Sequence, residues 1–461
     1  MSKFLSEKLG VAAEIIPGFA FKSEEFGKTG TIAIKIKDIN PPIINAAEAD
    51  RVNVSNYSRE RLKKYEIHEG DFVVAMTGAT VGKIGKHVSK EVLYTNQRVA
   101  KIVPRSGFCK EFVYYAIQGG DFLKFILNRL DSSSAQGNIS GTSIGEYPIP
   151  CPDFQTQRGV AAVLSALDAK IELNNRINAE LEGMAKLLYD YWFVQFDFPM
   201  TANQAAALGK PHLTGHPYRA SGGKMIYNET LKRDIPEGWV VTTLSKFANI
   251  TMGQSPPGES YNQEGSGLVF FQGSTDFGWR YPQVREFTTA PSRLAKAGDI
   301  LLSVRAPVGT LNIADQACCI GRGLAALNAK SGHDALLFEV MLYFKTIFDR
   351  RNASGTTFGS ITKDDLHSLE FACPSTGSLL LDAFEEKMKP VHKAILNNHQ
   401  QNQELTQLRD WLLPMLMNGQ VTVGTNERRI SIPRTMSNEP QRREDSPPHP
   451  RHHETRRKSI A

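Results

Sequence analysis

The stretch Asp168–Leu181 reads DAKIELNNRINAEL, and its apolar residues recur with the spacing of a long helix. Alternating steps of four and three residues connect the a and d positions of a heptad repeat. These positions are Val160, Leu164, Leu167, Ile171, Asn174, Asn178, Leu181, Ala185 and Leu188. Two neighbouring seam positions are asparagine, although such a seam normally buries leucine. The pattern predicts a long helix whose amides need a structural explanation.

A second copy of the same seam lies 224 residues further along the chain. Its positions are Phe384, Met388, Val391, Ile395, Asn398, Asn402, Leu405, Arg409 and Leu412. Asn398 and Asn402 occupy the two positions that Asn174 and Asn178 occupy in the first copy. Because two asparagines in register within matching heptad patterns rarely arise by chance, an internal duplication is the better explanation.

Other segments repeat in the same order along the chain. Gly137–Pro152 parallels Gly359–Pro374, and Gly70–Val74 parallels Gly298–Leu302. Each copy combines short β-like runs, Gly-rich turns and one helical patch, so each predicts an α+β unit. The predicted parts are a first unit at 1–152, a long helix at 153–198, a largely extended connector at 199–238, a second unit at 239–374, a second long helix at 375–418 and a basic tail at 419–461.

The asparagines have a predicted role in aligning the two helices. Two helices with identical seams bury them most simply against each other, as an antiparallel intramolecular coiled coil. Buried amides satisfy one another in one register, so Asn174, Asn178, Asn398 and Asn402 are predicted to fix that register. The pair would hold the two units at opposite ends, related by a pseudo-twofold axis. The alternative is that the amides lie on a solvated edge of two ordinary amphipathic helices.

The net charge is concentrated at one end of an otherwise ordinary globular composition. The 461 residues are 41% hydrophobic and carry a net charge of +6. Between Asn426 and Ala461 lie nine Lys or Arg and five Asp or Glu, which leaves +2 for the preceding residues. Any DNA-binding surface in the units must therefore arise from local clusters of cations. The low-complexity tail is predicted to be disordered.

The five cysteines include no CxxC pair, so reduced thiols are expected rather than a metal site or a disulfide framework. No apolar run approaches the ~18 residues of a membrane span, and the first residues lack a signal-peptide pattern. The expected location is the cytoplasm, with no membrane partner.

These features together resemble a known family, the DNA specificity subunits of type I restriction–modification enzymes. The resemblance covers the chain up to about residue 420 and rests on the duplicated unit-plus-helix plan. It also rests on three segments. They are GDILLSVRAPVGTLNIADQACCIGRGLAAL (Gly298–Leu327), PYRASGGKMIYNETLKRDIPEGW (Pro217–Trp239) and the LDAKIELNNRINAELE helix.

The resemblance implies that each unit is a target recognition domain that reads one half of a bipartite site in double-stranded DNA. The helices would set the spacer and dock two modification subunits, which bind S-adenosylmethionine and methylate adenine N6. Restriction subunits would cleave and translocate DNA with ATP and Mg²⁺. The resemblance implies no cofactor and no catalysis in this chain, and the long basic tail departs from the family plan.

Two segments weakly suggest catalysis. Asn40–Pro42 is similar to the motif with which adenine methyltransferases hold the flipped base, but Ile43 replaces the stacking aromatic residue. Gly78–Gly85 is similar to a phosphate-binding loop, but its spacing is too short and Ile84 replaces the Mg²⁺-binding Ser or Thr. An extended Pro-Pro loop and a turn between strands are the better interpretations.

DNA readers need Arg, Lys, Asn or Gln at base edges and further cations at phosphates. The candidates are Lys83, Lys86, Gln97 and Arg98 in the first unit, and Trp279, Arg280, Tyr281, Arg305, Asn312 and Arg322 in the second. Specificity is expected where the two copies differ. Arg305 and Arg322 could instead be scaffold residues that bond buried carbonyls. The rival function, from another class, is a coiled-coil scaffold or adaptor that does not bind DNA.

Overall fold

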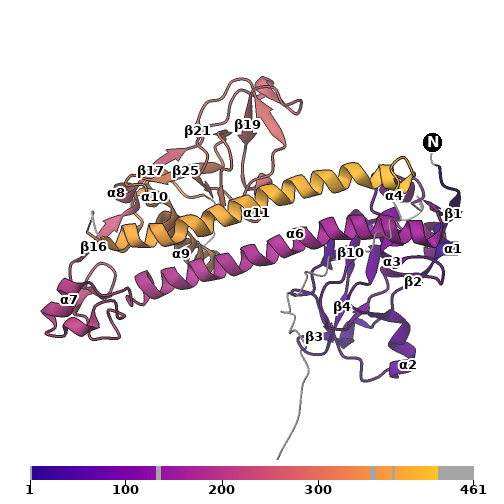
Figure 1. The fold of residues 1–461 in the computed structure, drawn as a ribbon, viewed down its shortest axis with the longest axis horizontal. Coiled ribbons are helices and arrows are strands. Elements are labelled where there is room, and N and C mark those ends of the chain that lie inside the picture. Colours follow the sequence, from indigo (N-terminus) through magenta and orange to yellow (C-terminus); the bar gives the residue numbers. More distant parts are fainter. Residues whose placement is uncertain (1–2, 131–136, 354–359, 376–378, 424–461) are drawn as a thin grey trace, which may run out of the picture.

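Two long helices form the axis of the molecule in the computed structural model, which describes residues 3–130, 137–353, 360–375 and 379–423. Helix α6 (Phe154–Tyr189) and helix α11 (Leu379–Met417) lie side by side (Figure 1). A π-helical turn, Asp190–Val194, extends α6. The two globular units lie at opposite ends and on opposite sides of the helix pair (Figure 1). The predicted α+β plan with a pseudo-twofold axis is confirmed.

The helices run antiparallel, and their asparagines meet in the interface. Asn174 Nδ2 donates hydrogen bonds to Asn402 Oδ1 and to Gln401 Oε1, both at 2.8 Å. Asn398 Nδ2 donates to Asn178 Oδ1 at 2.8 Å. Since Asn174 is 0% exposed and Asn178 is 2% exposed, the alternative of a solvated edge is wrong. The role of these amides in fixing the register stays a prediction.

Unit 1, residues 3–152, is built from two main sheets. Its six-stranded sheet has the order β2 (Ala13–Pro17), β12 (Val99–Pro104), β9 (Phe72–Ala75), β10 (Ile84–Lys86), β6 (Ile43–Ile44) and β5 (Ile39–Asn40). The five-stranded sheet has the order β3 (Phe26–Gly27), β7 (Arg51–Val52), β4 (Thr31–Ile34), β11 (Leu93–Thr95) and β8 (Glu66–Ile67). A pair, β1 (Ser6–Lys8) and β13 (Pro148–Pro150), and helices α1 (Leu9–Ala12), α2 (Arg59–Leu62), α3 (Lys110–Ala116), α4 (Gly120–Leu127) and α5 (Gly141–Gly145) complete it.

Unit 2, residues 239–374, repeats this arrangement. Its four-stranded sheet has the order β17 (Ala248–Met252), β25 (Leu324–Ala329), β22 (Ile300–Ser303) and β23 (Leu311–Ile313). The five-stranded sheet has the order β18 (Tyr261–Asn262), β20 (Glu286–Thr288), β19 (Leu268–Phe271), β24 (Cys318–Ile320) and β21 (Leu294–Ala295). The pair β16 (Trp239–Thr243) and β26 (Glu370–Pro374) corresponds to β1 and β13 of unit 1. Helices α8 (Leu244–Phe247), α9 (Asp334–Ala353) and α10 (Lys363–His367) complete unit 2, whose first sheet has two strands fewer than that of unit 1.

The connector between α6 and unit 2 is folded, so the prediction of a largely extended link is wrong. It contains helix α7 (Ala202–Ala207) and the hairpin of β14 (Met225–Asn228) and β15 (Arg233–Pro236). Phe198 stacks on Tyr218 and on Trp239, with ring centroids 4.8 and 5.3 Å apart. Burial of these aromatic rings joins the connector to the core of unit 2.

Two further expectations concern the ends of the chain and membranes. The predicted disordered tail lies outside the described residues from residue 424 onward. None of the helices in the described part of the chain combines the length and apolar character needed to cross a membrane.

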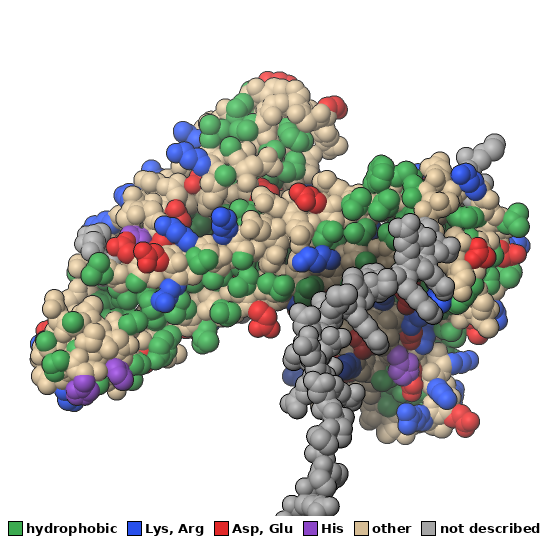
Figure 2. Space-filling view, in the orientation of Figure 1, with side chains coloured by type: hydrophobic (Ala, Val, Ile, Leu, Met, Phe, Trp, Pro, Cys, Tyr) green, Lys and Arg blue, Asp and Glu red, His purple; other side chains and the backbone are tan. Residues whose placement is uncertain are grey.

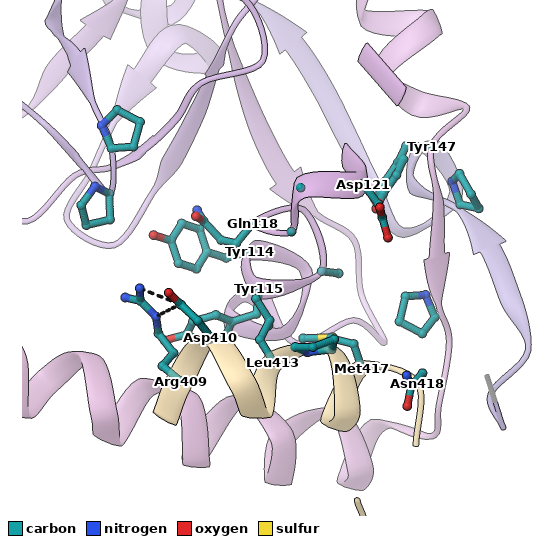
Figure 3. Close-up of a pocket in the computed structure, with 18 of the residues that line it drawn as sticks. Tyr114, Tyr115, Gln118, Asp121, Tyr147, Arg409, Asp410, Leu413, Met417 and Asn418 are labelled. Carbon is teal, nitrogen blue, oxygen red and sulfur yellow. Dashed lines mark hydrogen bonds and ion pairs between the residues drawn. The ribbon is translucent and has the colours of Figure 1, made fainter. Parts of the chain in front are cut away.

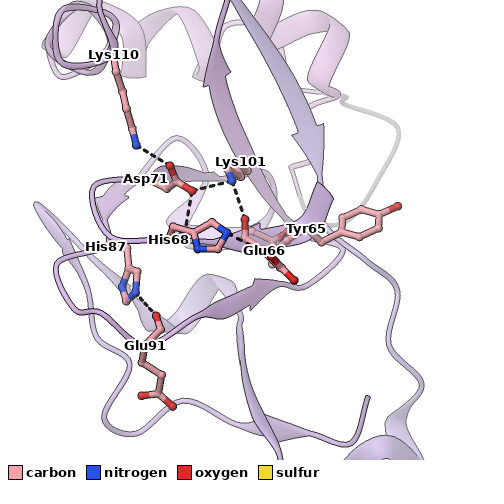
Figure 4. Close-up of polar contacts among 9 residues, drawn as sticks. Tyr65, Glu66, His68, Asp71, His87, Glu91, Lys101 and Lys110 are labelled. Carbon is pink, nitrogen blue, oxygen red and sulfur yellow. Dashed lines mark hydrogen bonds and ion pairs between the residues drawn. The ribbon is translucent and has the colours of Figure 1, made fainter. Parts of the chain in front are cut away.

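A buried carboxylate joins the two sheets of unit 1 to helix α3 (Figure 4). Asp71 lies 2.7 Å from Lys101 Nζ and 2.6 Å from Lys110 Nζ, and it accepts the backbone N–H of His68 at 3.0 Å. Lys101 also donates to the carbonyl of Glu66 at 2.7 Å. Burial alone would raise the pKa of Asp71, but the hydrogen bonds from His68, Lys101 and Lys110 lower it below its ordinary value of 3.8.

Asp71→Asn should lower the free energy of unfolding of unit 1 by about 2–3 kcal/mol at pH 7, because two ammonium groups lose their buried partner. The exposed pair Lys345–Asp349, at 2.6 Å, gives a matched control. Asp349→Asn should cost less than about 0.5 kcal/mol. Urea titrations would measure both variants, with hydrogen exchange followed in β9 for Asp71→Asn and in α9 for Asp349→Asn.

A carboxyl group whose pKa is lower in the folded than in the unfolded chain stabilises the fold at pH values above its unfolded pKa. This stabilisation is lost as the pH falls through the pKa of the folded chain. The difference between the wild-type chain and Asp71→Asn should therefore shrink below the ordinary carboxyl value of 3.8. Equal stability of the two proteins at pH 7 would contradict the proposed contribution of this network.

Candidate nucleic-acid interface

In both units, corresponding loops meet at the ends of two inner strands of a sheet. These strands are β9 and β12 of the six-stranded sheet in unit 1, and β22 and β25 of the four-stranded sheet in unit 2. In unit 1, Met76 N–H donates to the carbonyl of Arg98 at 2.9 Å, and Ile139 N–H donates to the carbonyl of Met76 at 3.0 Å. In unit 2, Val304 N–H donates to Gly323 at 2.9 Å, and Ile361 N–H donates to Val304 at 2.8 Å. The matching hydrogen bonds show that each unit builds this edge, called the loop edge below, from equivalent backbone.

In each unit, one glycine allows the end of a strand to pack directly against the backbone of the loop edge. A Cβ atom on Gly18 would lie 2.2 Å from the carbonyl oxygen of Asn96, and one on Gly253 would lie 2.1 Å from that of Gly321. Both distances are too short for any side chain, so glycine is required at each position by the close approach of backbone. The glycines explain how the loop edge stays the same although the surrounding side chains differ.

In unit 1 the loop edge surrounds an open cavity of about 580 Å³. Thr77, Gln97, Arg98, Asn138 and Ser140 supply its polar lining. Gln97 and Arg98 are exposed, and Thr77 pairs with Asn138 as an isolated β-bridge. Amide and guanidinium groups of this kind can contact base edges or phosphates.

In unit 2 the equivalent positions carry different side chains. Arg305 forms an isolated β-bridge with Ser360, as Thr77 does with Asn138 in unit 1. Arg322 lies in the loop of unit 2 that corresponds to the loop with Gln97 in unit 1. The side chains of Arg305 and Arg322 are exposed. The backbone belongs to the shared framework, whereas these exposed side chains differ between the copies.

Lys83 and Lys86 occupy different surroundings. Lys83 is exposed, and its carbonyl accepts the N–H of Ala75 at 2.9 Å, so it lies beside the loop edge. Lys86 is half-buried at the other end of β10, with its ammonium 5.4 Å from the ring centroid of Tyr114. Lys83 therefore lies next to the end of β9 that leads into the loop edge, and Lys86 faces a different part of the unit.

The structure corrects the prediction for Arg280, Tyr281 and Asn312. Their side chains are 3%, 5% and 0% exposed, so the base edges of DNA cannot reach them in this arrangement. Arg280 Nη1 lies 2.7 Å from Glu182 Oε1 of α6, and the ring of Tyr281 stacks on His399 of α11 at 4.4 Å.

Asn312 has a structural role in the same region. Its side chain exchanges hydrogen bonds of 3.1 and 3.0 Å with the backbone of Gly278. The neighbouring Trp279 is 57% exposed and stays a candidate.

The sequence did not identify Thr77, Asn138 and Ser360 as site residues. Alignment of the two copies would have placed these three residues beside the predicted ones.

On the face of the described residues that Figure 2 draws, charge does not gather in one large basic field. On the face drawn in Figure 2, Lys and Arg side chains are interspersed with Asp and Glu side chains on both units. This distribution agrees with the near-neutral charge of the part before the tail. Binding of DNA by the units would then depend on short-range contacts at the loop edges rather than on long-range attraction.

Comparison with known families agrees with the duplicated architecture. The family described as type I restriction modification DNA specificity domain matches residues 3–183 and 236–407, which include both units and most of both helices. The chain belongs to this family. Its function is sequence-specific DNA recognition for a type I restriction–modification system, and the scaffold alternative is disfavoured.

Curated relatives share the length of the chain as well as the family. The putative type I restriction enzyme MjaX specificity subunit of Methanocaldococcus jannaschii is 28% identical over 389 residues, covering 81% of this chain and 83% of the relative. The HindI specificity subunit of Haemophilus influenzae is 23% identical, covering 68% and 77%. A crystal structure of the type I restriction-modification S subunit from M. genitalium has a TM-score of 0.53 at 14% identity, covering 90% and 96%, and so shares the fold.

Proposed function

We propose that the two loop edges read the two halves of a bipartite DNA target. One observation carries the proposal: equivalent backbone presents Thr77, Gln97 and Asn138 in one unit, and Arg305, Arg322 and Ser360 in the other. A shared framework with different side chains is suited to reading two different sequences at a fixed separation. The antiparallel helices hold that separation constant.

The partners of the chain supply the chemistry in this proposal. Two modification subunits, one on each half of the pseudo-twofold arrangement, methylate adenine N6 with S-adenosylmethionine. Restriction subunits use ATP and Mg²⁺ to translocate and cleave DNA. The equivalent surfaces on the two halves support the binding of two copies of one partner, as expected for symmetric assemblies.

Arg322→Ala should relax recognition at one position of one half-site, at a cost of about 1–3 kcal/mol in discrimination for a base contact. Gln97→Ala should act on the other half-site only. Long-read mapping of N6-methyladenine, in cells that carry the modification subunit and each variant, would show which half has changed. Lys246→Ala is the matched control. Lys246 is also exposed in unit 2, but it lies on α8, before β17, whereas the loop edge lies after the other end of β17.

The outcomes separate base contact from other roles. A loss of methylation at all sites without relaxed specificity would assign Arg322 to a phosphate contact. An unchanged two-part motif in both the Arg322→Ala and the Gln97→Ala variant, with normal amounts of the complex, would overturn the loop-edge proposal. Methylation that does not depend on this chain at all would remove its role in recognition.

A further inference from the structure

A groove of about 850 Å³ lies between the last turns of α11 and unit 1 (Figure 3). Tyr114, Tyr115 and Tyr147 line it from unit 1, and Leu413 and Met417 line it from α11. Tyrosine rings and aliphatic side chains give the groove apolar walls with polar ends. We refer to it as the tyrosine groove.

The tyrosine groove is acidic. Its lining includes the carboxylates of Asp121, Asp168 and Asp410 and one guanidinium, that of Arg409. Arg409 lies 2.9 Å from Asp168 Oδ1 and 2.9 Å from Asp410 Oδ1, so one cation is shared by two carboxylates. The Asp121 side chain is 89% exposed, and its ion pair with Lys124 is long, at 3.7 Å. The lining therefore has a net negative charge and would attract a basic peptide.

One buried donor in the groove lacks an acceptor. Gln118 lines the groove, and its Nε2 is buried without a hydrogen-bond partner among the described residues. Buried amide groups are nearly always hydrogen-bonded in folded proteins. A peptide carbonyl that entered the groove would satisfy this amide.

The other half of the molecule shows how such a surface is covered. At the 224-residue offset of the duplication, Leu413 corresponds to Tyr189 and Met417 corresponds to Phe193. Tyr189 and Phe193 are only 6% and 7% exposed, whereas Leu413 and Met417 are half-buried. Tyr189 and Phe193 share one buried apolar core with Phe198, Met200 and Tyr218, which belong to the chain that follows α6. The chain that follows α6 therefore covers the end of α6.

The corresponding chain after α11 is the basic tail. At the same offset, the connector at 199–238 corresponds to the residues from 423 onward. The tail carries nine Lys or Arg and five Asp or Glu from Asn426 onward. Asn418 lines the groove only a few residues before the tail begins. Position and charge match this segment to the groove.

We propose that the basic tail, residues 424–461, docks in the tyrosine groove of its own chain. It would cover the end of α11 as the connector covers the end of α6. The carboxylates of Asp121 and Asp410 would attract its arginines, and Gln118 would donate to its backbone. The alternative occupants of the groove are a segment of a modification subunit and the tail of a second copy of this chain.

Photo-crosslinking in the full-length chain tests this proposal. Pro414 is exposed and lines the groove, so benzoylphenylalanine at position 414 should crosslink to peptides from residues 424–461 of the same chain. The same photoreactive residue in place of Tyr227 is the control, because Tyr227 is 54% exposed in the hairpin of the connector, beyond the other end of the helices. The yield at position 414 should fall by at least about fivefold at high salt, because salt screens the attraction.

Charge reversal in the groove gives a second readout. Asp121→Lys with Asp410→Lys should lower the crosslinking yield to the tail by at least about fivefold, since both carboxylates would become repulsive to a basic segment. Asp234→Lys, at an exposed position of β15, should leave the yield unchanged. Circular dichroism and urea midpoints would verify that each variant is folded.

Three results would overturn the proposal. One is the absence of crosslinks from position 414 to the tail in folded, full-length chain at low salt. Another is crosslinking of position 414 to a modification subunit in the assembled complex while the tail is not crosslinked, which would assign the groove to that partner. The third is crosslinking only between isotopically labelled and unlabelled copies, which would assign it to a second chain.

Discussion

Arg280→Ala should lower the free energy of unfolding of unit 2 by about 3 kcal/mol, at the lower end of the cost of breaking a buried ion pair, because its partner Glu182 is 33% exposed. Arg280 is 3% exposed, and its Nη1 lies 2.7 Å from Glu182 Oε1 of α6. Its guanidinium also lies 4.3 Å from the ring centroid of Phe338. The substitution would leave Glu182 without its ion-pair partner and would remove the cation that most lowers the pKa of the buried Glu339.

Arg285→Ala is the matched control for this prediction. Arg285 also belongs to unit 2, but its side chain is 54% exposed and its ion pair with Asp276 is long, at 3.6 Å. Its removal should cost less than about 1 kcal/mol. Urea titrations and hydrogen exchange in β22 and β25 would report both variants. Equal, small effects would show that the Arg280 ion pair does not hold unit 2 on the helices.

The pH dependence gives this prediction a specific signature. Burial raises the pKa of Glu339 to about 7, while Arg280 acts in the opposite direction. A raised carboxyl pKa destabilises the fold above the folded pKa, and this cost disappears as pH falls below the unfolded value of 4.5. Without Arg280 the pKa of Glu339 should rise further. The difference between Arg280→Ala and the wild-type chain should therefore grow as pH rises above about 7.

Arg280 and Tyr281 join unit 2 to both long helices. Arg280 contacts Glu182 of α6, and the ring of Tyr281 stacks on His399 of α11 at 4.4 Å. Burial lowers the pKa of His399, so a neutral imidazole packs on the tyrosine ring. Together with the apolar core that α6 and α11 share with unit 2, these two consecutive residues help to hold unit 2 in place on the helix pair.

The sequence predicts the helices well because their seams are periodic and duplicated. Each seam needs only local spacing to be recognised, and the repeated asparagines show that the two seams face each other. The connector could not be predicted in this way. Its Gly and Pro content suggests an extended link, whereas its burial depends on Phe198 and Tyr218 packing against Trp239, which belongs to the next unit.

The candidate site was predicted in part for a similar reason. Gln97, Arg98, Arg305 and Arg322 follow strands at turns, where exposure is common, and the structure exposes all four. Arg280 has the same side-chain chemistry as Arg322, but its partner Glu182 lies 98 residues away in the sequence. Only the folded structure shows which arginine is enclosed by a carboxylate and an aromatic ring.

Replacing all four interface asparagines, Asn174, Asn178, Asn398 and Asn402, by leucine should raise the stability of the helix pair and reduce its uniqueness. Each buried leucine adds about 1–3 kcal/mol of apolar burial, whereas a buried amide pair adds little net free energy. The buried Oδ1 of Asn174 has no hydrogen-bond partner among the described residues, so the native interface already includes a cost that leucine removes. The denaturation midpoint should therefore rise.

The same variant should lose its single register. The amides of Asn174 and Asn402, 2.8 Å apart, cannot pair after a shift of one heptad, whereas leucines can. Such a shift moves the two units by about 10 Å, at ~1.5 Å per residue, and also permits pairing between chains. Light scattering should detect dimers, and distances measured between spin labels on the two units should become multiple. Leucine at the exposed positions Glu180 and Gln403 is the control, because it adds apolar surface outside the seam.

The combination of results tests the physical reason for the amides. Greater stability with several registers would mean that the asparagines lower stability in exchange for one fixed distance between the loop edges. A variant that is less stable, or that stays monomeric with one distance between the units, would contradict this role. In that case the remaining seam residues and the Arg280–Glu182 ion pair would be sufficient to hold the two half-site readers in register.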